Sequence, residues 1–286
     1  MRVLVTGAAG MLGQRVVAEA HERGYAVAAL TREDVDLTDA ARTQSLFAER
    51  EPDAIVHCAA YTDVDGAESD ESAAMAGNRD AALNVARAAE ASGARIVAVS
   101  TDYVFDGSMA SAEQPRPYVE SDEVSPIGAY GRSKLAAEDA VGEACGNHAI
   151  VRTAWVFGAG GKNFCETMLT AAETRDEVRV VTDQIGSPTW TGHLAPALLD
   201  LAAMPDRGVF HVAGGGMCSW HELTVELFAQ AGVACRVEPT TSDAFPRPAA
   251  RPAWSVLASE REETPRLPSW LDGVRGFLNE RGRPTQ

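Results

Sequence analysis

The chain has 286 residues and a formal net charge of −16, with 45% hydrophobic and 23% charged residues. This length suits one large domain or two modest ones. The negative charge argues against nucleic acid and anionic membranes as partners, and no apolar run approaches the roughly 20 residues of a membrane span. Five scattered cysteines without a C-x-x-C pair indicate reduced thiols rather than a zinc site or disulfides. We therefore expect a cytoplasmic protein.

A β-branched run at the N-terminus leads into Gly7, and an amphipathic helix pattern follows the spacing G-x-x-G-x-x-G. A strand, a tight glycine turn and a helix N-terminus form an anion site, because bare N–H groups and the helix dipole favour a phosphate there. Gly7 permits the sharp turn, and Gly10 lets the backbone approach a pyrophosphate. Gly13 lets the helix pack close to the sheet. We expect Gly7, Gly10, Met11 and Leu12 to bind a dinucleotide.

The second predicted strand covers 25–30 and ends just before Arg32. In dinucleotide-binding folds, an acidic residue at the end of this strand holds the ribose hydroxyls of NAD, whereas an arginine there accommodates the 2′-phosphate of NADP. Arg32 has no carboxylate before it, which favours NADPH over NADH, but Asp34 and Asp36 follow closely and leave NADH open. We expect Arg32, Asp36 and Leu37 at the adenosine end of the cofactor.

The next elements alternate regularly: a helix over 39–50, a strand over 54–58, a long helix over 69–91 and a strand over 95–99. Ala59, Ala60 and Tyr61 follow the third strand, where small residues suit a surface that a flat cofactor crosses; a plain tight turn is the alternative. Asn78 and Asn84 are poor interior helix residues. One of them is a candidate to bond to the sheet, and a solvated amide is the alternative.

The fourth strand delivers residues 100–103 to its carboxyl end, the edge where open parallel sheets bind ligands. A long loop over 105–125, rich in Pro, Ser and Glu, follows it. Loops of this length are usually functional or disordered.

Tyr130 and Lys134 lie four residues apart on a predicted helix that extends to about residue 144, so their side chains share one face. A tyrosine of pKa ~10 is a poor acid at neutral pH unless a cation favours its phenolate, and Lys134 can supply that charge. Of 25 basic residues only Lys134 and Lys162 are lysines, which favours positions that need a compact ammonium. With the glycine turn and Thr101, the pair indicates a catalytic centre.

These motifs resemble the short-chain dehydrogenase/reductase superfamily and, within its extended branch, the dTDP-4-dehydrorhamnose reductase family. The resemblance covers about residues 1–260 and is carried by segments 6–13, 59–68, 100–107, 130–134, 152–158, 161–164, 183–189 and 251–257. The run from Thr101 to Gly107 is its most specific part. The resemblance implies an α/β fold with a doubly wound parallel (Rossmann) sheet and a smaller C-terminal substrate-binding lobe.

The resemblance also implies residue roles. Tyr130 would be the proton donor to the sugar C4 oxygen, Lys134 its electrostatic partner and ribose ligand, and Thr101 a hydrogen-bond donor to the carbonyl. The sugar pocket would be lined by Thr62, Val64, Asp102, Tyr103 and Trp155.

Two departures from related patterns narrow the chemistry. Some family members have a glutamate associated with a metal where this chain has Arg15, so we expect no metal. Sugar-nucleotide dehydratases place an Asp-Glu pair after the catalytic threonine, whereas here Tyr103 follows Asp102. The acid needed to eliminate water is missing, which favours carbonyl reduction.

The C-terminal part predicts helices over 163–174, 193–203 and 220–231 and strands over 178–182 and 209–212. We expect a dinucleotide-binding domain over 1–157 and a substrate lobe over 158–286, with segments around 183–213 returning to the first. Arg247 and Arg251 are candidates to grip a nucleotide diphosphate, and a solvated loop is the alternative.

Three functions fit these observations. The first is NAD(P)H-dependent reduction of the C4 carbonyl of a nucleotide-linked 4-keto-6-deoxy sugar, as in the conversion of dTDP-4-dehydrorhamnose to dTDP-L-rhamnose. The second is a nucleotide-sugar epimerase that retains its NAD. The third is a non-catalytic subunit similar to the regulatory subunit of methionine adenosyltransferase. The expected partner is a nucleotide-sugar, with a homodimer as one candidate assembly, and the sugar stereochemistry stays open.

Overall fold

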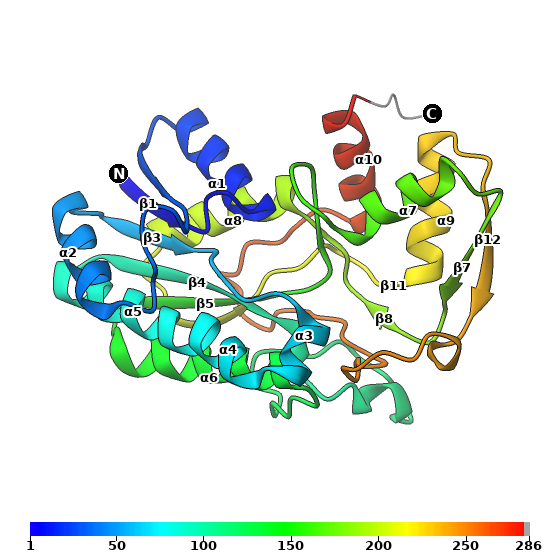
Figure 1. The fold of residues 1–286 in the computed structure, drawn as a ribbon, viewed down its shortest axis with the longest axis horizontal. Coiled ribbons are helices and arrows are strands. Elements are labelled where there is room, and N and C mark those ends of the chain that lie inside the picture. Colours follow the sequence, from blue (N-terminus) through cyan, green and yellow to red (C-terminus); the bar gives the residue numbers. More distant parts are fainter. Residues whose placement is uncertain (283–286) are drawn as a thin grey trace.

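A computed structural model describes residues 1–282, and its largest element is a six-stranded parallel sheet (Figure 1). The strands are β1 (Arg2–Thr6), β2 (Ala26–Leu30), β3 (Ala54–His57), β4 (Arg95–Thr101), β5 (His148–Thr153) and β10 (Gly208–His211), in the order β10-β5-β4-β3-β1-β2. The chain passes from β1 to β2 on one side and then returns to β3 on the other. The strand order therefore reverses at β1, as a doubly wound sheet requires.

Helices cover both faces of this sheet (Figure 1). On one face α1 (Met11–Glu22) and α8 (Thr191–Ala203) pack on the side chains of Val3, Val5 and Val97. On the other face α2 (Ala40–Arg50), α5 (Ala81–Ser92) and α6 (Ala129–Ala144) pack on Leu4 and Ile96. Successive residues of a strand point to opposite faces of the sheet. Because helices cover both faces, these strands are apolar at nearly every position.

A second, smaller group of elements lies beyond the carboxyl ends of the strands (Figure 1). It contains α7 (Phe164–Ala172), α9 (Trp220–Ala231) and α10 (Trp270–Glu280), and β7 (Glu177–Val181) paired in parallel with β12 (Arg236–Thr240). Two short pairs connect it to the large sheet: β6 (Val156–Phe157) with β9 (Thr189–Trp190), and β8 (Ile185–Gly186) with β11 (Cys218–Ser219). Phe157, Leu227 and Phe277 are buried in its separate core.

The long helix predicted over 69–91 is present as one continuous helical run from Glu71 to Ser92, which contains a π-helical turn. The structure has α3 (Val64–Ser69), α4 (Glu71–Met75), a π-helical turn at Ala76–Asp80, and then α5. Asp63 and Asp70 each accept a backbone N–H three residues on and begin a new helix. The π turn is tied to a neighbouring loop through Asn78, as described below; such turns are frequent at functional sites.

The segment predicted as a long loop over 105–125 carries a 3₁₀ turn at Ser108–Ser111, and further 3₁₀ turns lie at Asp102–Val104, just before it, and at Ser242–Ala244. Tyr118 bridges to Leu257, and Phe105 and Tyr118 are buried with Trp254. The loop is therefore ordered by a segment more than a hundred residues away. None of the helices in residues 1–282 is long and apolar enough to cross a membrane.

Candidate active site

The glycine turn lies where the strand order reverses. Gly7 has φ +67°, and a Cβ there would lie 2.6 Å from the backbone nitrogen of Ala59, at the end of the adjacent strand β3. A Cβ on Gly13 would lie 2.2 Å from the Gly7 carbonyl oxygen. Gly10 begins α1 without a side-chain cap, so Met11 and Leu12 offer the first N–H groups of the helix. This cradle fits a dinucleotide pyrophosphate.

The two acids near Arg32 are engaged in local turns. Asp34 accepts hydrogen bonds from the backbone N–H and the hydroxyl of Thr31, both at 2.8 Å. Asp36 accepts from the backbone N–H and hydroxyl of Thr38, which lower the pKa of its carboxyl. Leu37 packs partly buried beside the core, and Arg32 is exposed. The carboxylates are thus turn-forming groups, while the guanidinium is accessible.

Asn78 joins the loop after β3 to the helix that carries Tyr130. Its side chain accepts from the Tyr61 N–H at 2.8 Å and donates to the Tyr61 carbonyl and to the Ser133 hydroxyl, the latter at 2.8 Å. Ser133 in turn donates to the Tyr130 carbonyl. Asn78 therefore fixes the backbone that follows Ala59 and Ala60, whereas Asn84 donates to the carbonyls of Leu37 and Thr38.

The end of β4 meets the start of α6 at Thr101, Tyr103 and Tyr130. A Cβ on Gly131 would lie 2.3 Å from the Tyr103 carbonyl oxygen, so the helix packs directly on the 3₁₀ turn. The Tyr103 and Tyr130 rings meet edge to face at 5.7 Å, and the Thr101 hydroxyl lies within hydrogen-bonding reach of the Tyr130 phenol. The structure thus brings the predicted catalytic threonine and tyrosine together.

Lys134 is one turn beyond Tyr130, 6% exposed, and its Nζ donates to the Val99 carbonyl at 2.8 Å. Burial lowers its pKa to about 8. Burial and, second, Asp102 raise the pKa of Tyr130 to about 12, while Thr101 opposes them. Burial thus dominates the pKa of the Tyr130 phenol and keeps the group protonated. The role of Lys134 as electrostatic partner of the phenolate stays a prediction.

Asp102 is buried next to Thr101, whose hydroxyl lies 3.0 Å from Asp102 Oδ1. Its Oδ2 has no hydrogen-bond partner of good geometry within residues 1–282, although the nearby Ser255 hydroxyl still lowers the carboxyl's pKa. Burial dominates and raises that pKa to about 6. An acceptor without a partner at a sheet edge is a feature of sites that receive a polar ligand.

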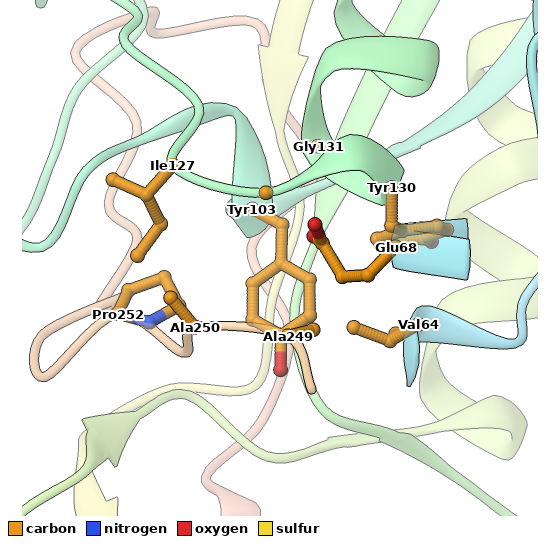
Figure 2. Close-up of a pocket in the computed structure, with 10 residues that line it drawn as sticks. Val64, Glu68, Tyr103, Ile127, Tyr130, Gly131, Ala249, Ala250 and Pro252 are labelled. Atoms are coloured by element: carbon orange, nitrogen blue, oxygen red, sulfur yellow. The ribbon is translucent and has the colours of Figure 1, made fainter. Parts of the chain in front are cut away.

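A small pocket, partly open to solvent, lies beside Tyr130 (Figure 2). Val64, Tyr103 and Tyr130 line it together with Glu68, Ile127, Ala249, Ala250 and Pro252. Thr62, Asp102, Trp155 and Arg251 do not line it. Glu68 accepts the Ala129 N–H at 2.7 Å and so caps the helix that carries Tyr130.

Arg251 lies in an ion pair rather than free toward the cavity. Its Nη1 and Nη2 donate to the two carboxylate oxygens of Asp65 at 2.9 and 3.0 Å, and Arg247 approaches the same carboxylate at 3.6 Å. The Ala249 N–H also donates to Asp65. This contact joins the 247–251 segment to α3.

Trp155 follows β5 with φ +48°, a left-handed conformation that is rare for an aromatic residue. Its ring stacks on Trp220 at a centroid distance of 3.5 Å, and a Cβ on Gly186 would strike it. Strained backbone of this kind is typical of functional sites. Trp155 thus connects the large sheet to the smaller group of elements.

Asn78, Glu68 and Asp65 hold parts of the site in place and were not predicted as site residues. Asn78 carried a signal as a poor helix former, whereas the others are common residues whose roles come from long-range contacts. Arg15, the predicted departure from a metal-associated glutamate, pairs with Glu19 at 3.6 Å. Within residues 1–282 no three His, Cys, Asp or Glu side chains gather as a metal site.

Comparison with known families explains this arrangement. The model of the RmlD substrate binding domain matches residues 1–282. The chain belongs to this family. A dTDP-4-dehydrorhamnose reductase from Mycobacterium tuberculosis (strain H37Rv) is 46% identical over 263 residues, which cover 91% of this chain and 86% of that protein. The spore coat polysaccharide biosynthesis protein SpsK of Bacillus subtilis (strain 168) is 38% identical and covers 98% of both chains.

Solved structures agree with this placement in the family. A dTDP-4-dehydrorhamnose reductase from Bacillus anthracis, in complex with NADP, has a TM-score of 0.93 and 37% identity, with 98% of this chain and 99% of that chain covered. A UDP-glucose 4-epimerase from Thermus thermophilus in complex with NAD has a TM-score of 0.78 at 24% identity. At that identity it shows a shared fold alone.

Proposed function

We propose that the protein catalyses the NADPH-dependent reduction of the C4 carbonyl of a dTDP-linked 4-keto-6-deoxy sugar, converting dTDP-4-dehydrorhamnose to dTDP-L-rhamnose. The observation that carries this proposal is Thr101 and Tyr130 meeting at the sheet edge with Lys134 one turn behind, next to a cavity and a glycine cradle. Membership of the family and the names of its relatives support the substrate class.

Tyr130 and Thr101 act on the carbonyl oxygen. Hydride from the reduced nicotinamide is the chemistry that the cofactor supplies when it is bound. Thr101 donates a hydrogen bond to the carbonyl, and the Tyr130 phenol transfers its proton to the oxygen as negative charge develops. A raised pKa keeps Tyr130 fully protonated at neutral pH, as a proton donor must be. Lys134 would balance the phenolate that is left and hold ribose hydroxyls.

The other predicted site residues would bind the cofactor and the sugar nucleotide. Gly7, Gly10, Met11 and Leu12 would hold the pyrophosphate, and Arg32 the 2′-phosphate, with Asp36 and Leu37 beside the adenosine and Ala59, Ala60 and Tyr61 along its path. Thr62, Val64, Asp102, Tyr103 and Trp155 would surround the sugar, and Arg251 would meet the diphosphate. The preference for NADPH rests on Asp34 and Asp36 being engaged in turns.

We further propose a domain organisation and an assembly for this chain. The first is a dinucleotide-binding part over 1–157 and a substrate part over 158–286. It is supported by α8 and β10, from the 183–213 region, lying with the large sheet. The second is a homodimer in the cytoplasm, which stays a prediction from the sequence.

The deciding experiment follows NADPH oxidation with dTDP-4-dehydrorhamnose and identifies the product by NMR. We expect stoichiometric oxidation and a dTDP-6-deoxyhexose with a new C4 hydroxyl. Cofactor that co-purifies tightly and interconversion of sugars without net oxidation would indicate an epimerase. Cofactor binding without turnover of any nucleotide-sugar would indicate a non-catalytic subunit.

A further inference from the structure

Helix α6 places a third ionisable group in line with Tyr130 and Lys134. Glu138 follows Lys134 by four residues, as Lys134 follows Tyr130, so all three lie on one helix face. That face is buried against β4 and β5: Lys134 and Glu138 are each 6% exposed. A carboxylate at such a depth is rare unless it is paired.

Glu138 is held in a fully bonded, buried network. Ser100, on β4, donates its hydroxyl to Glu138 Oε1 at 2.5 Å, and Arg152, on β5, donates from Nε at 3.0 Å and from Nη2 to Oε2 at 2.7 Å. Arg152 in turn lies 3.4 Å from the His211 ring on β10 and over the Phe105 ring. These bonds fix the position of the Glu138 carboxylate.

Lys134 and Glu138 line the same small pocket, which is partly open to solvent. His57, at the end of β3, and Ser100 line the same space. The lysine's own hydrogen bond goes to the Val99 carbonyl, so Glu138 acts on it through space. In this confined, poorly solvated setting a charge interacts more strongly than in water.

The other charged and titratable groups around the pair are accounted for. Burial lowers the pKa of Lys134 to about 8, while Glu138 and, less strongly, Cys58 oppose this. Burial and Lys134 lower the pKa of His57 to about 3, so His57 is neutral at physiological pH. Tyr130 is protonated, and Asp139, next along α6, has a carboxyl pKa raised partly by Glu138. Glu138 is therefore the anion that bears most on Lys134.

We propose that Glu138 is a positioning residue for the reaction: clamped by Arg152 and Ser100, it keeps the buried Lys134 ammonium charged at neutral pH. Without it, desolvation would neutralise the lysine in the pH range where the protein works. The role of Glu138 in catalysis rests on the proposed function. The link between Glu138 and Lys134 is a property of the chain itself.

The near absence of lysine from the chain makes a direct test feasible. Labelling with lysine carrying ¹³C at Cε gives two side-chain signals, from Lys134 and Lys162, and Lys162→Arg assigns them. We expect the Lys134 signal to titrate near pH 8 in the wild type. In Glu138→Gln its midpoint moves lower by about one pH unit. Ser100→Ala, which keeps the carboxylate, leaves the midpoint nearly in place.

A second variant covers the chance that Glu138→Gln fails to fold, since it leaves the buried Arg152 cation without its partner. Glu138→Gln/Arg152→Gln removes both charges, and its Lys134 midpoint should still lie below that of the wild type. A Lys134 midpoint at the wild-type value in the folded variants overturns the proposal. A midpoint that is lowered equally by Ser100→Ala also overturns it, because the effect would then come from packing.

The pH dependence of the kinetics tests whether Glu138 affects the reaction through Lys134. The alkaline limb of kcat/KM for NADPH and dTDP-4-dehydrorhamnose should move to lower pH in Glu138→Gln by the same amount as the NMR midpoint. A fall in kcat without displacement of this limb would mean a merely structural pair. Absence of reduction by the wild type would overturn the proposed function, while the NMR result on Lys134 would stand by itself.

Discussion

At the scale of single residues, burial shifts the pKa values of both Tyr130 and Lys134 so that the neutral form of each is favoured. The pKa of Tyr130 is raised to about 12 and that of Lys134 is lowered to about 8, in both cases chiefly by burial. A phenol with a raised pKa stays protonated at neutral pH and can therefore give its proton to the alkoxide that forms at C4. Lys134 matters after the transfer, when the buried phenolate needs a counter-charge.

Tyr130→Phe should keep cofactor binding and lose turnover by about 10²–10⁴, the usual contribution of a positioned acid. The ring contact with Tyr103 survives the change, so the melting temperature should hardly move. Steady-state kinetics and cofactor titration by fluorescence measure the two quantities. A kcat like that of the wild type would remove Tyr130 from the mechanism.

Lys134→Arg should be a severe change although it retains the charge. A planar guanidinium cannot reproduce the contact of the buried, compact ammonium, which donates to the Val99 carbonyl. We expect about a tenfold or greater loss of kcat and weaker cofactor binding, in line with the loss of a charge-assisted bond. Lys162→Arg, at an exposed position, is the matched control. Equal behaviour of the two variants would contradict the role given to Lys134.

Arg32→Ala should weaken NADPH far more than NADH. A charge-assisted bond to a phosphate contributes about 1.5–3 kcal/mol, or roughly ten- to a hundredfold in affinity, and NADH has no 2′-phosphate. Measuring kcat/KM for both cofactors in wild type and variant decides this. If both cofactors lost equally, Arg32 would serve the fold or the adenine face, and the preference for NADPH would fall.

At the scale of elements, the strand ends are tied to one another by buried polar contacts. His57 at the end of β3 and Thr6 at the end of β1 are joined by a hydrogen bond of 2.7 Å between Nδ1 and Oγ1. His57 is 3% exposed, and burial lowers its pKa to about 3. Two parallel strands therefore share a histidine that stays neutral in the folded protein.

This histidine should make the fold sensitive to acid. Between pH 6.5 and about 3 the unfolded chain binds a proton that folded His57 does not, so stability falls as the pH decreases through that window. The loss from pH 7 to pH 5 is about 2 kcal/mol. Urea unfolding at both pH values should show a smaller loss in His57→Asn than in the wild type. Equal losses would mean that His57 is protonated in the folded state.

At the scale of the whole molecule, few polar contacts join the 247–251 segment to the body. Asp65 receives two bonds from Arg251 and one from the Ala249 N–H, with side chains 27% and 20% exposed. Because a bidentate pair to a partly buried carboxylate is among the stronger surface interactions, Asp65 is the main anchor of this segment.

Asp65→Asn should accelerate amide hydrogen exchange over 247–251 by about tenfold or more, from the loss of charge-assisted bonds. Exchange within α9 should stay unchanged. Glu71→Gln, which breaks the exposed pair with Arg132, is the matched control and should leave 247–251 as it is. Unchanged exchange over 247–251 in Asp65→Asn would show that other contacts hold the segment.

The sequence by itself determined the features that depend on local chain geometry. The glycine spacing, the i,i+4 pair of Tyr130 and Lys134, and the apolar strands before Gly7 and Ser100 follow from short-range sterics and periodicity, so the doubly wound fold was predictable. Family resemblance then supplied the chemistry. The helix over 220–231 was predicted with the bounds that the structure has, because Ser219 and Glu222 form its capping box.

The tertiary structure alone decided which distant groups meet. Asn78, within the π turn of the predicted helix, bonds to Tyr61; Arg251 pairs with Asp65 186 residues away, and Trp155 stacks on Trp220. The rise in the Tyr130 pKa likewise reflects burial, which no spacing reveals. Such contacts are between residues far apart in the chain, and their energies depend on desolvation and exact approach, which only the packed fold fixes.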